Sequence, residues 1–162
     1  MKREDQDGQI RQLLHLIDEA FDHPAWHGPN LRDSIRGLTV EQASWRPKAG
    51  RHNIWEIVVH CAYWKYAVRR RILAEKRGSF VLEGSNWFQR PIEKSNAAWR
   101  RDVELLEIEH TALRKAVSSL QAVHLKRKLH GSKWTMLQTI SGIAAHDVYH
   151  AGQIRLLKRL QR

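Results

Sequence analysis

Two histidines near the C-terminal end of the chain have the spacing of paired metal ligands. The segment HDVYHAGQIRLLKRL begins with His146 and places His150 one helical turn further on. The apolar stripe formed by Met136, Ile140 and Ile143 continues in steps of three and four onto both histidines. Side chains four residues apart on a helix have Cβ atoms about 5–6 Å apart, which suits two nitrogens that each bind one ion at about 2.1 Å. The pattern predicts that both imidazoles point inward and can share a cation.

A third histidine lies on the apolar face of another predicted helix. His60 has Ile57 one turn before it and Trp64 one turn after it. Three inward imidazoles form a ligand set that leaves a coordination position open, as in catalytic zinc sites. The alternative is that each ring is a hydrogen-bonded core histidine, because ten histidines in 162 residues make any one spacing unremarkable. The other pair with this spacing, His23 and His27, contains a proline and cannot share one helical face.

The predicted chemistry depends on the molecule that completes the coordination of the ion. A divalent ion lowers the pKa of bound water and deprotonates a coordinating thiol, and either species is a strong nucleophile at neutral pH. Glu56, a candidate catalytic residue, could accept a hydrogen bond from the imidazole of His60, or could act only as the capping partner of Asn53. Gln153, the second candidate, could orient substrate or water, or merely cap a polar pocket. We expect Cys61 to be a small core residue rather than a ligand.

Four long helices are predicted to position these side chains. Their apolar residues recur at intervals of three and four, and no alternating strand pattern is evident. The predicted helices are Gly8–Asp22, Asn53–Arg77, Ile92–Leu120 and Thr135–Leu160. Capping boxes are expected at the starts of the second and fourth helices, where Asn53 is followed by Glu56 and Thr135 by Gln138.

The predicted fold class is all-α, a four-helix bundle in a single domain over residues 1–162. The linker between the first two helices, residues 23–52, is long enough to carry a crossover connection rather than a tight antiparallel turn. In the loop after the second helix, residues 78–91, Trp87 and Phe88 are expected to form a lid or a dimer contact.

The composition favours an intracellular protein. The single cysteine fits a reducing compartment, and no apolar run approaches the 18 or more residues that a membrane span needs. The charged N-terminal stretch MKREDQDGQ lacks the apolar segment of a secretory signal. We therefore expect a cytoplasmic protein with no membrane partner.

The net charge of +11 raises the question of nucleic-acid binding. Many of the cations fall near predicted helix C-termini, where they favour the helix dipole and need no partner. A solvated basic surface is therefore the preferred explanation, and nucleic acid is an unlikely partner.

Two segments resemble the DinB/YfiT-like superfamily. HDVYHAGQI is similar to its C-terminal signature, and NIWEIVVHCAYW, residues 53–64, is similar to its second-helix motif. The resemblance implies a four-helix bundle with an up-down-down-up path and a divalent zinc or nickel ion held by His60, His146 and His150. It also implies a homodimer that acts on small molecules, either by transferring a low-molecular-weight thiol cosubstrate onto an electrophile or by hydrolysis. One departure is His52-Asn53, where members often have Trp-Ser or Trp-Thr, which affects the pocket wall near the helix start.

Three functions remain open at this point. The first is a metal-dependent enzyme, a thiol S-transferase or a hydrolase. The second is a non-catalytic module in which the ion only joins two helices, and the third is a basic nucleic-acid-binding module. An occupied fourth protein ligand would favour the second function, whereas an open coordination position would favour the first.

Overall fold

The computed structural model describes the backbone of residues 3–78 and 80–162, and the side chains from residue 8 onward within those ranges. Residues 1, 2 and 79, which belong to the expected domain and loop, lie outside the described residues. The described chain is all-helical, as predicted, and contains no β-strand. Its elements are α1 (Arg3–Phe21), α2 (Leu31–Ile35), α3 (Val40–Ser44), α4 (Ile54–Ile72), α5 (Asn96–Ser118), the 3-10 turn η1 (Ala122–His124) and α6 (Met136–Leu160). None of these helices has both the length and the apolar character needed to cross a membrane.

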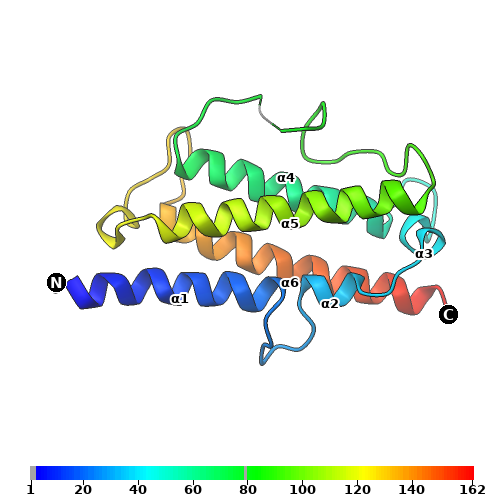
Figure 1. Ribbon diagram of the computed structural model, residues 1–162, viewed down its shortest axis with the longest axis horizontal. Coiled ribbons are helices and arrows are strands. Elements are labelled where there is room, and N and C mark those ends of the chain that lie inside the picture. The colour runs from blue at the N-terminus through cyan, green and yellow to red at the C-terminus, as the bar shows by residue number, and fades with distance from the viewer. Residues whose placement is uncertain (1–2, 79) are drawn as a thin grey trace.

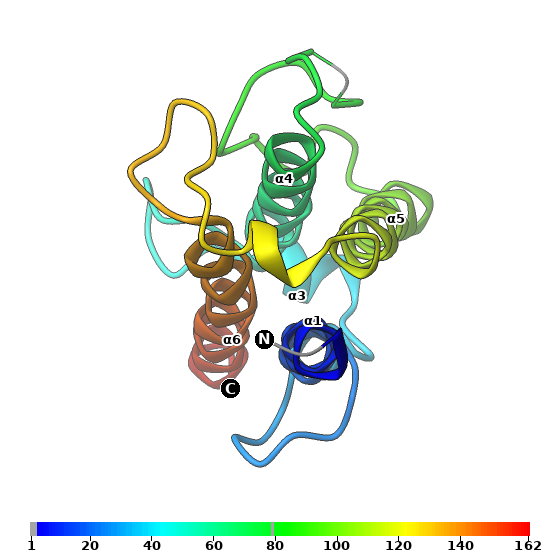
Figure 2. The same ribbon diagram turned by 90° about the vertical axis from the view of Figure 1, so that its left-hand side faces the viewer.

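The long helices α1, α4, α5 and α6 lie side by side, as the lengthwise and end-on views show (Figures 1 and 2). In Figure 1, α1 and α6 run from left to right, whereas α4 and α5 run from right to left. Ring and polar contacts agree with this path, because Trp55 meets Trp99 near the start of α4 and α5, and Lys65 meets His110 further along both. The connection that returns along the length of the molecule is therefore the segment between α4 and α5. The linker containing α2 and α3, which was expected to carry a crossover, joins two antiparallel helices instead.

The helix starts are set by local side-chain hydrogen bonds, as predicted. Capping boxes are present at Asn53 with Glu56 and at Thr135 with Gln138. They satisfy backbone N–H groups that have no partner inside the helix. The third long helix begins later than predicted, at Asn96 rather than Ile92, because the hydroxyl of Ser95 caps it by accepting from the N–H of Ala98. These caps determine which residues of α4 and α6 face the interior.

The helix α4 ends five residues before the predicted end, at Ile72 rather than Arg77. Ala74 has a φ of 55°, in the left-handed region that interrupts a helix. Consequently Lys76 and Arg77 lie beyond the helix, and only the arginines at 69–71 stand in its last turn. The helix-dipole explanation therefore covers three arginines of α4, not Lys76 and Arg77, and it also covers Lys158 and Arg159 in the last turn of α6.

A buried ion pair joins α4 to α6 in the middle of the molecule. Lys65 and Asp147 are each only 1% exposed, and the Lys65 ammonium donates a hydrogen bond to the Asp147 carboxylate. The ammonium also lies 3.4 Å from Nδ1 of His110, a ring that stacks on Phe21 with centroids 3.6 Å apart. Burial, reinforced by the Lys65 charge, lowers the pKa of His110 to about 2, so this ring is a neutral acceptor. His110 is therefore a buried core residue.

Replacing Lys65 by Met is expected to lower the free energy of unfolding by about 3–5 kcal/mol, because Asp147 would remain buried without its cation. Urea unfolding of the metal-free protein measures the change. Arg36→Met, which breaks an exposed pair with Asp33, is the matched control and should change stability by less than about 1 kcal/mol. The double variant Lys65→Met/Asp147→Leu should recover most of the loss, because it removes both charges. Equal effects of Lys65→Met and Arg36→Met would contradict the importance of the buried pair.

Candidate metal centre

Three histidine side chains meet at the contact between α4 and α6. His60 comes from α4, and His146 and His150 come from successive turns of α6. Nε2 of His146 lies 3.1 Å from Nε2 of His60 and 3.1 Å from Nε2 of His150. Nitrogens bound to one tetrahedral ion at about 2.0–2.1 Å are themselves about 3.3–3.4 Å apart. The structure thus brings together the three predicted ligands at separations that one cation could bridge.

The outer hydrogen bonds of two rings determine the direction of their lone pairs. Nδ1 of His60 lies 2.8 Å from the backbone carbonyl oxygen of Asn86, which can only accept, so Nδ1 carries the proton. Nδ1 of His150 lies 2.7 Å from Oε1 of Gln153 and donates to it in the same way. In the neutral rings both Nε2 atoms are then unprotonated and face His146, which can donate to only one of them. A cation would satisfy all three nitrogens at once.

Burial keeps these imidazoles neutral at physiological pH. It lowers the pKa of His146 to about 3, with smaller contributions from His150, His60 and the buried Lys65 ammonium. It lowers the pKa of His150 to about 4, although the hydrogen bond to Gln153 acts in the opposite direction. The pKa of His60 is lowered for the same reason, with the hydrogen bond to the Asn86 carbonyl opposing the shift. Neutral imidazole is the form that binds metal, so no proton has to leave these rings near pH 7.

The loop between α4 and α5 covers the histidines. Trp87 stacks on His60 with ring centroids 3.8 Å apart, and His52 stacks on Trp87 at 3.6 Å. Asn86, with a φ of 65°, accepts from His60 through its carbonyl and from the indole N–H of Trp64 through its side chain, at 2.9 Å. The wall near the start of α4 is therefore built by His52 and Trp87 together. Trp87 matches the expected lid in position, whereas its neighbour in the sequence, Phe88, is part of the core.

Asn86 was not among the residues singled out from the sequence. Its role depends on its backbone carbonyl, which any residue possesses. The available signal is the turn-like run Gly84-Ser-Asn86, since Asn tolerates positive φ better than most residues. That signal predicts a turn, but it does not predict which histidine the turn will meet.

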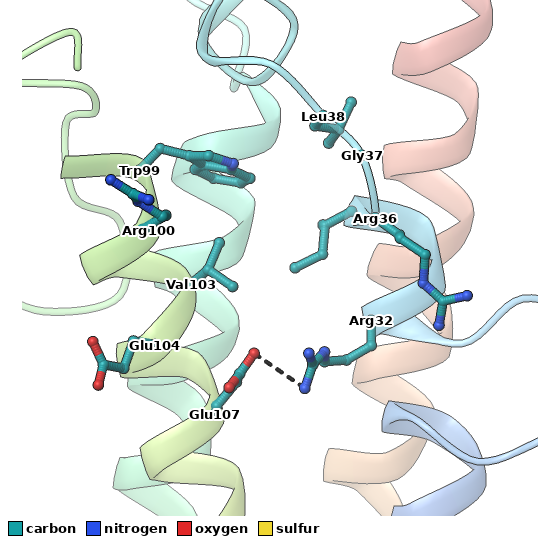
Figure 3. A pocket seen from close by; sticks show the side chains of 10 residues that line it. Arg32, Arg36, Gly37, Leu38, Trp99, Arg100, Val103, Glu104 and Glu107 are labelled. Atoms are coloured by element: carbon teal, nitrogen blue, oxygen red, sulfur yellow. Dashed lines mark ion pairs between the residues drawn. The ribbon is translucent and has the colours of Figure 1, made fainter. Parts of the chain in front are cut away.

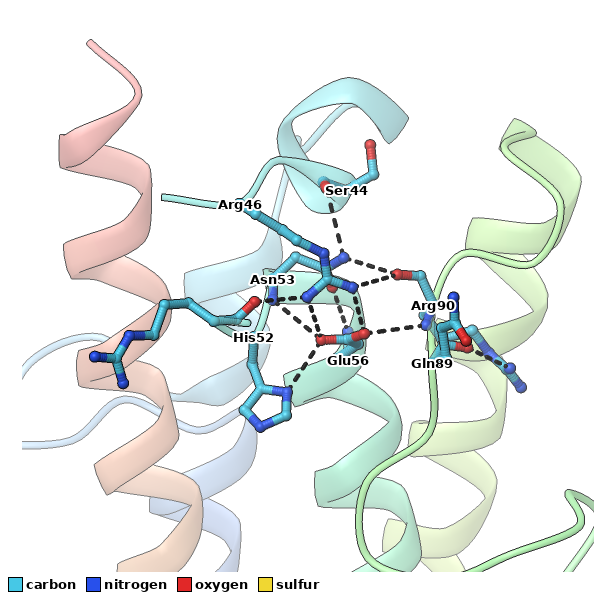
Figure 4. A network of polar contacts seen from close by, with 8 residues as sticks. Ser44, Arg46, His52, Asn53, Glu56, Gln89 and Arg90 are labelled. Carbon is cyan, nitrogen blue, oxygen red and sulfur yellow. Dashed lines mark hydrogen bonds and ion pairs between the residues drawn. The ribbon is translucent and has the colours of Figure 1, made fainter. Parts of the chain in front are cut away.

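Glu56 lies at the centre of a polar network rather than in contact with a metal-site histidine (Figure 4). Its carboxylate accepts from the Arg46 guanidinium at 2.8 Å, from Nδ1 of His52 at 3.1 Å, and from the backbone N–H of Asn53 and Arg90. Asn53 also donates to the carbonyl of Arg90 at 2.8 Å. Of the two predicted roles, the structure shows the capping one. The same carboxylate fixes the segment that carries Asn86 and Trp87, so Glu56 acts on the site through the loop.

Gln153 contacts the site directly. While its Oε1 accepts from His150, its Nε2 donates to the hydroxyl of Tyr149 at 2.9 Å. The Tyr149 side chain is 62% exposed, so this chain of contacts leads from the buried ring to the surface. This contact is with the imidazole of His150, a candidate metal ligand, and the predicted contact of Gln153 with substrate or water stays a prediction.

A second grouping of potential ligands shares one histidine with the first. Cys61, His146 and Asp147 place one ligand atom each within 4.8 Å of one another. The Asp147 carboxylate, however, is already paired with Lys65. Burial, reinforced by the Asp147 charge, raises the pKa of the Cys61 thiol well above its usual range, which agrees with the predicted role as a small core residue. The three-histidine group is therefore the better candidate.

Replacing Gln153 by Ala is expected to weaken divalent-ion binding about 10- to 100-fold, because the His150 ring would lose the acceptor that fixes its tautomer and orientation. Competition for zinc with a chromophoric chelator measures the change. Gln12→Ala, at an exposed position of α1, removes the same side chain away from the site and is the matched control. Equal zinc affinity of Gln153→Ala and Gln12→Ala would show that the contact does not support the site.

Glu56 is expected to stabilise the protein near neutral pH and to lose that effect in acid. Burial alone would raise its pKa, but hydrogen bonds from Arg46, His52 and Arg90 together outweigh burial and hold the pKa below the ordinary value of 4.5. A carboxyl whose folded-state pKa is depressed contributes fully above its unfolded pKa, and this contribution disappears as the pH falls through the folded pKa. Glu56→Gln should therefore cost about 1–3 kcal/mol near pH 7 and progressively less toward about pH 3.

Urea unfolding of the metal-free protein and of Glu56→Gln across this range measures the difference. Glu104→Gln, at an exposed position of α5, is the control and should change the free energy of unfolding little. A constant difference between wild type and Glu56→Gln from neutral to acid pH would contradict the prediction.

Comparison with known proteins agrees with the sequence resemblance. A sequence profile of the DinB superfamily matches residues 24–154, a segment that contains all three histidines. Searches of curated proteins and of solved structures gave no match. Since the profile spans most of the sequence, the chain belongs to the DinB superfamily.

Proposed function

We propose that this protein is a divalent-metal-dependent enzyme whose ligands are His60, His146 and His150. One observation carries the proposal: three Nε2 atoms converge, and two of these rings direct their Nδ1 protons outward to Asn86 and Gln153. His146 can donate a hydrogen bond to Nε2 of only one of the other two histidines, so the lone pair on at least one Nε2 atom has no donor. A bound cation supplies the missing partner.

The ligand set suits zinc or nickel, because neutral imidazole binds both. When bound, such an ion acts as a Lewis acid that makes a thiol or a water molecule nucleophilic at neutral pH. Three protein ligands leave a position for that molecule, as in catalytic rather than structural zinc sites. The stacked rings of His52, Trp87 and His60 cover one side of the cluster and limit the access of bulk water.

Transfer of a small thiol fits the surrounding residues better than hydrolysis. A hydrolase commonly needs a carboxylate or imidazole to move protons to and from water. The two carboxylates nearest in sequence to the histidines are already engaged, Glu56 with Arg46 and Asp147 with Lys65. A thiol needs less help, because its pKa is lower than that of water. In the proposed reaction the thiol releases its proton to solvent, and its sulfur forms a bond to an electrophilic carbon of the second substrate. The bond from that carbon to a leaving group breaks in the same step, and the leaving group departs with the electron pair.

The proposal includes the finer description of the fold and assembly. The four long helices are taken to form a DinB-type four-helix bundle with an up-down-down-up path, which the helix directions in Figure 1 support. The family resemblance further suggests a homodimer that acts on small molecules in the cytoplasm.

Protein purified without a nickel column should contain about one divalent ion per chain by elemental analysis, and His146→Ala should contain almost none, because two imidazoles alone bind weakly. The metal-loaded wild type should accelerate thiol consumption with at least one member of a panel of thiol–electrophile pairs, and His146→Ala should not. His15→Ala, which removes an exposed histidine of α1, is the matched control and should keep both properties.

Unchanged metal content in His146→Ala would refute the site. Metal binding without turnover across the panel would favour an ion that only joins α4 to α6. Loss of the metal in Cys61→Ala would also favour that structural role, because it would identify a fourth protein ligand.

A further inference from the structure

A pocket opens beside His146 along the contact between α4 and α6. Its volume is about 470 Å³, and its walls include Trp64, Val68, Arg71, Trp134, Ile143 and His146. Val68 and Ile143 are buried apolar residues at its base, and the two tryptophans add flat, partly exposed surfaces. Because a candidate metal ligand forms part of this wall, a molecule in the pocket lies next to the cation site.

One face of α4 connects the cation site to a cationic side chain. His60, Trp64, Val68 and Arg71 follow one another at helical spacing, so they lie along one stripe of the helix. Eleven residues separate the first from the last, which corresponds to about 16 Å along the axis at about 1.5 Å per residue. Arg71 lies at the end of this stripe away from His60, and it lines the same pocket as His146. The stripe therefore runs from a Lewis-acid site, across an apolar floor, to a positive charge.

Arg71 differs from Arg69 and Arg70 in the partners of its guanidinium. Arg69 forms an ion pair with Glu75 at 3.0 Å, and Arg70 donates to the backbone carbonyl of Glu75 at 3.1 Å. Within residues 8–78 and 80–162, the Arg71 guanidinium has no such partner, although it forms part of the pocket wall. An unpaired guanidinium in a pocket wall is well suited to bind a carboxylate, with which it can form two parallel hydrogen bonds.

A pocket elsewhere on the molecule shows the contrasting arrangement. It lies between α2 and α5 and contains none of the three histidines (Figure 3). Its Arg32 pairs with Glu107 at 3.1 Å, and its Arg36 pairs with Asp33 at 2.6 Å. The protein's own carboxylates thus occupy two of its three guanidinium groups, and the third, that of Arg100, has no candidate metal ligand in the same pocket wall. That pocket is therefore a weaker candidate for an anionic ligand that also reaches the cation site.

We propose that the pocket beside His146 binds an organic acid with a flat apolar body, whose carboxylate pairs with Arg71 and whose other end faces the histidine cluster. This inference rests on the proposed function and specifies the substrate class of that site. The tryptophan faces and the buried Val68 and Ile143 receive the apolar body. Arg71 selects for the charge and sets which end of the molecule reaches the cation.

Binding of 5-phenylpentanoate and of its neutral amide, 5-phenylpentanamide, tests the proposal by titration calorimetry on metal-free and zinc-loaded protein. Wild type should bind the acid in both forms, and Arg71→Gln should weaken acid binding at least about tenfold while leaving amide binding unchanged. Arg71→Lys should retain part of the preference for the acid. Arg70→Gln removes an adjacent positive charge and is the matched control, with an expected change of less than about twofold. Thermal unfolding verifies that each variant remains folded.

Several results would overturn the proposal: no acid binding by wild type at millimolar concentration, equal binding of acid and amide, or equal effects of Arg71→Gln and Arg70→Gln. Acid binding that requires zinc and ignores Arg71 would show that the carboxylate binds the ion, which refutes the pocket but leaves the proposed function intact. If wild type binds the acid in an Arg71-dependent way but cannot be loaded with zinc, the result would support the pocket and refute the proposed function.

Discussion

The convergence of three imidazole Nε2 atoms, of which those of His60 and His150 are unprotonated, is the constraint on which the centre of this structure depends. Lone pairs of neutral rings repel one another at 3.1 Å unless a proton or a cation lies between them. The Nδ1 protons of His60 and His150 are held outward by Asn86 and Gln153, so rotating either ring inward would break a hydrogen bond. Protonation is also disfavoured, because burial lowers the pKa of His146 to about 3. A metal ion would relieve the conflict among the three Nε2 atoms, with the proton of His146 on Nδ1, a buried atom that has no hydrogen-bond partner among the described residues.

The same contact between α4 and α6 contains the buried pair of Lys65 and Asp147, next in sequence to the ligand His146. The pair carries no net charge, but it requires one register between the two helices, since a shift by one residue would separate the buried charges. That register also places His60 opposite His146 and His150. The ion pair is thus a positioning device for the histidines as well as a contribution to stability. Through this double role, two buried charges contribute both to the stability of the contact between α4 and α6 and to the placement of the histidines.

The sequence predicts the features that depend on local spacing and misses those that depend on distant backbone. The inward faces of α4 and α6 and both capping boxes follow from residues three or four apart, so they were predicted correctly. The predicted end of α4 at Arg77 was wrong, because no sequence pattern indicates that an alanine, Ala74, will adopt a positive φ. Asn86 and the contacts of Glu56 with Arg46 and Arg90 were missed, because they depend on where the long loop between α4 and α5 returns. The path of the loop between α4 and α5 could not be inferred from helical periodicity, because periodicity identifies the helices but not which of them pack together.

The charge around the histidines favours anionic reactants. The nearest carboxylates, Glu56 and Asp147, are neutralised by Arg46 and Lys65, so neither presents free negative charge to the site. The unpaired Arg71 and a net charge of +11 make the surroundings positive, and a bound divalent ion would add to that field. A positive, partly enclosed site raises the local concentration of anions and lowers the pKa of a bound thiol. The proposed thiolate formation and the proposed carboxylate binding would therefore draw on one electrostatic arrangement, in which the protein's own acids are paired with its own cations.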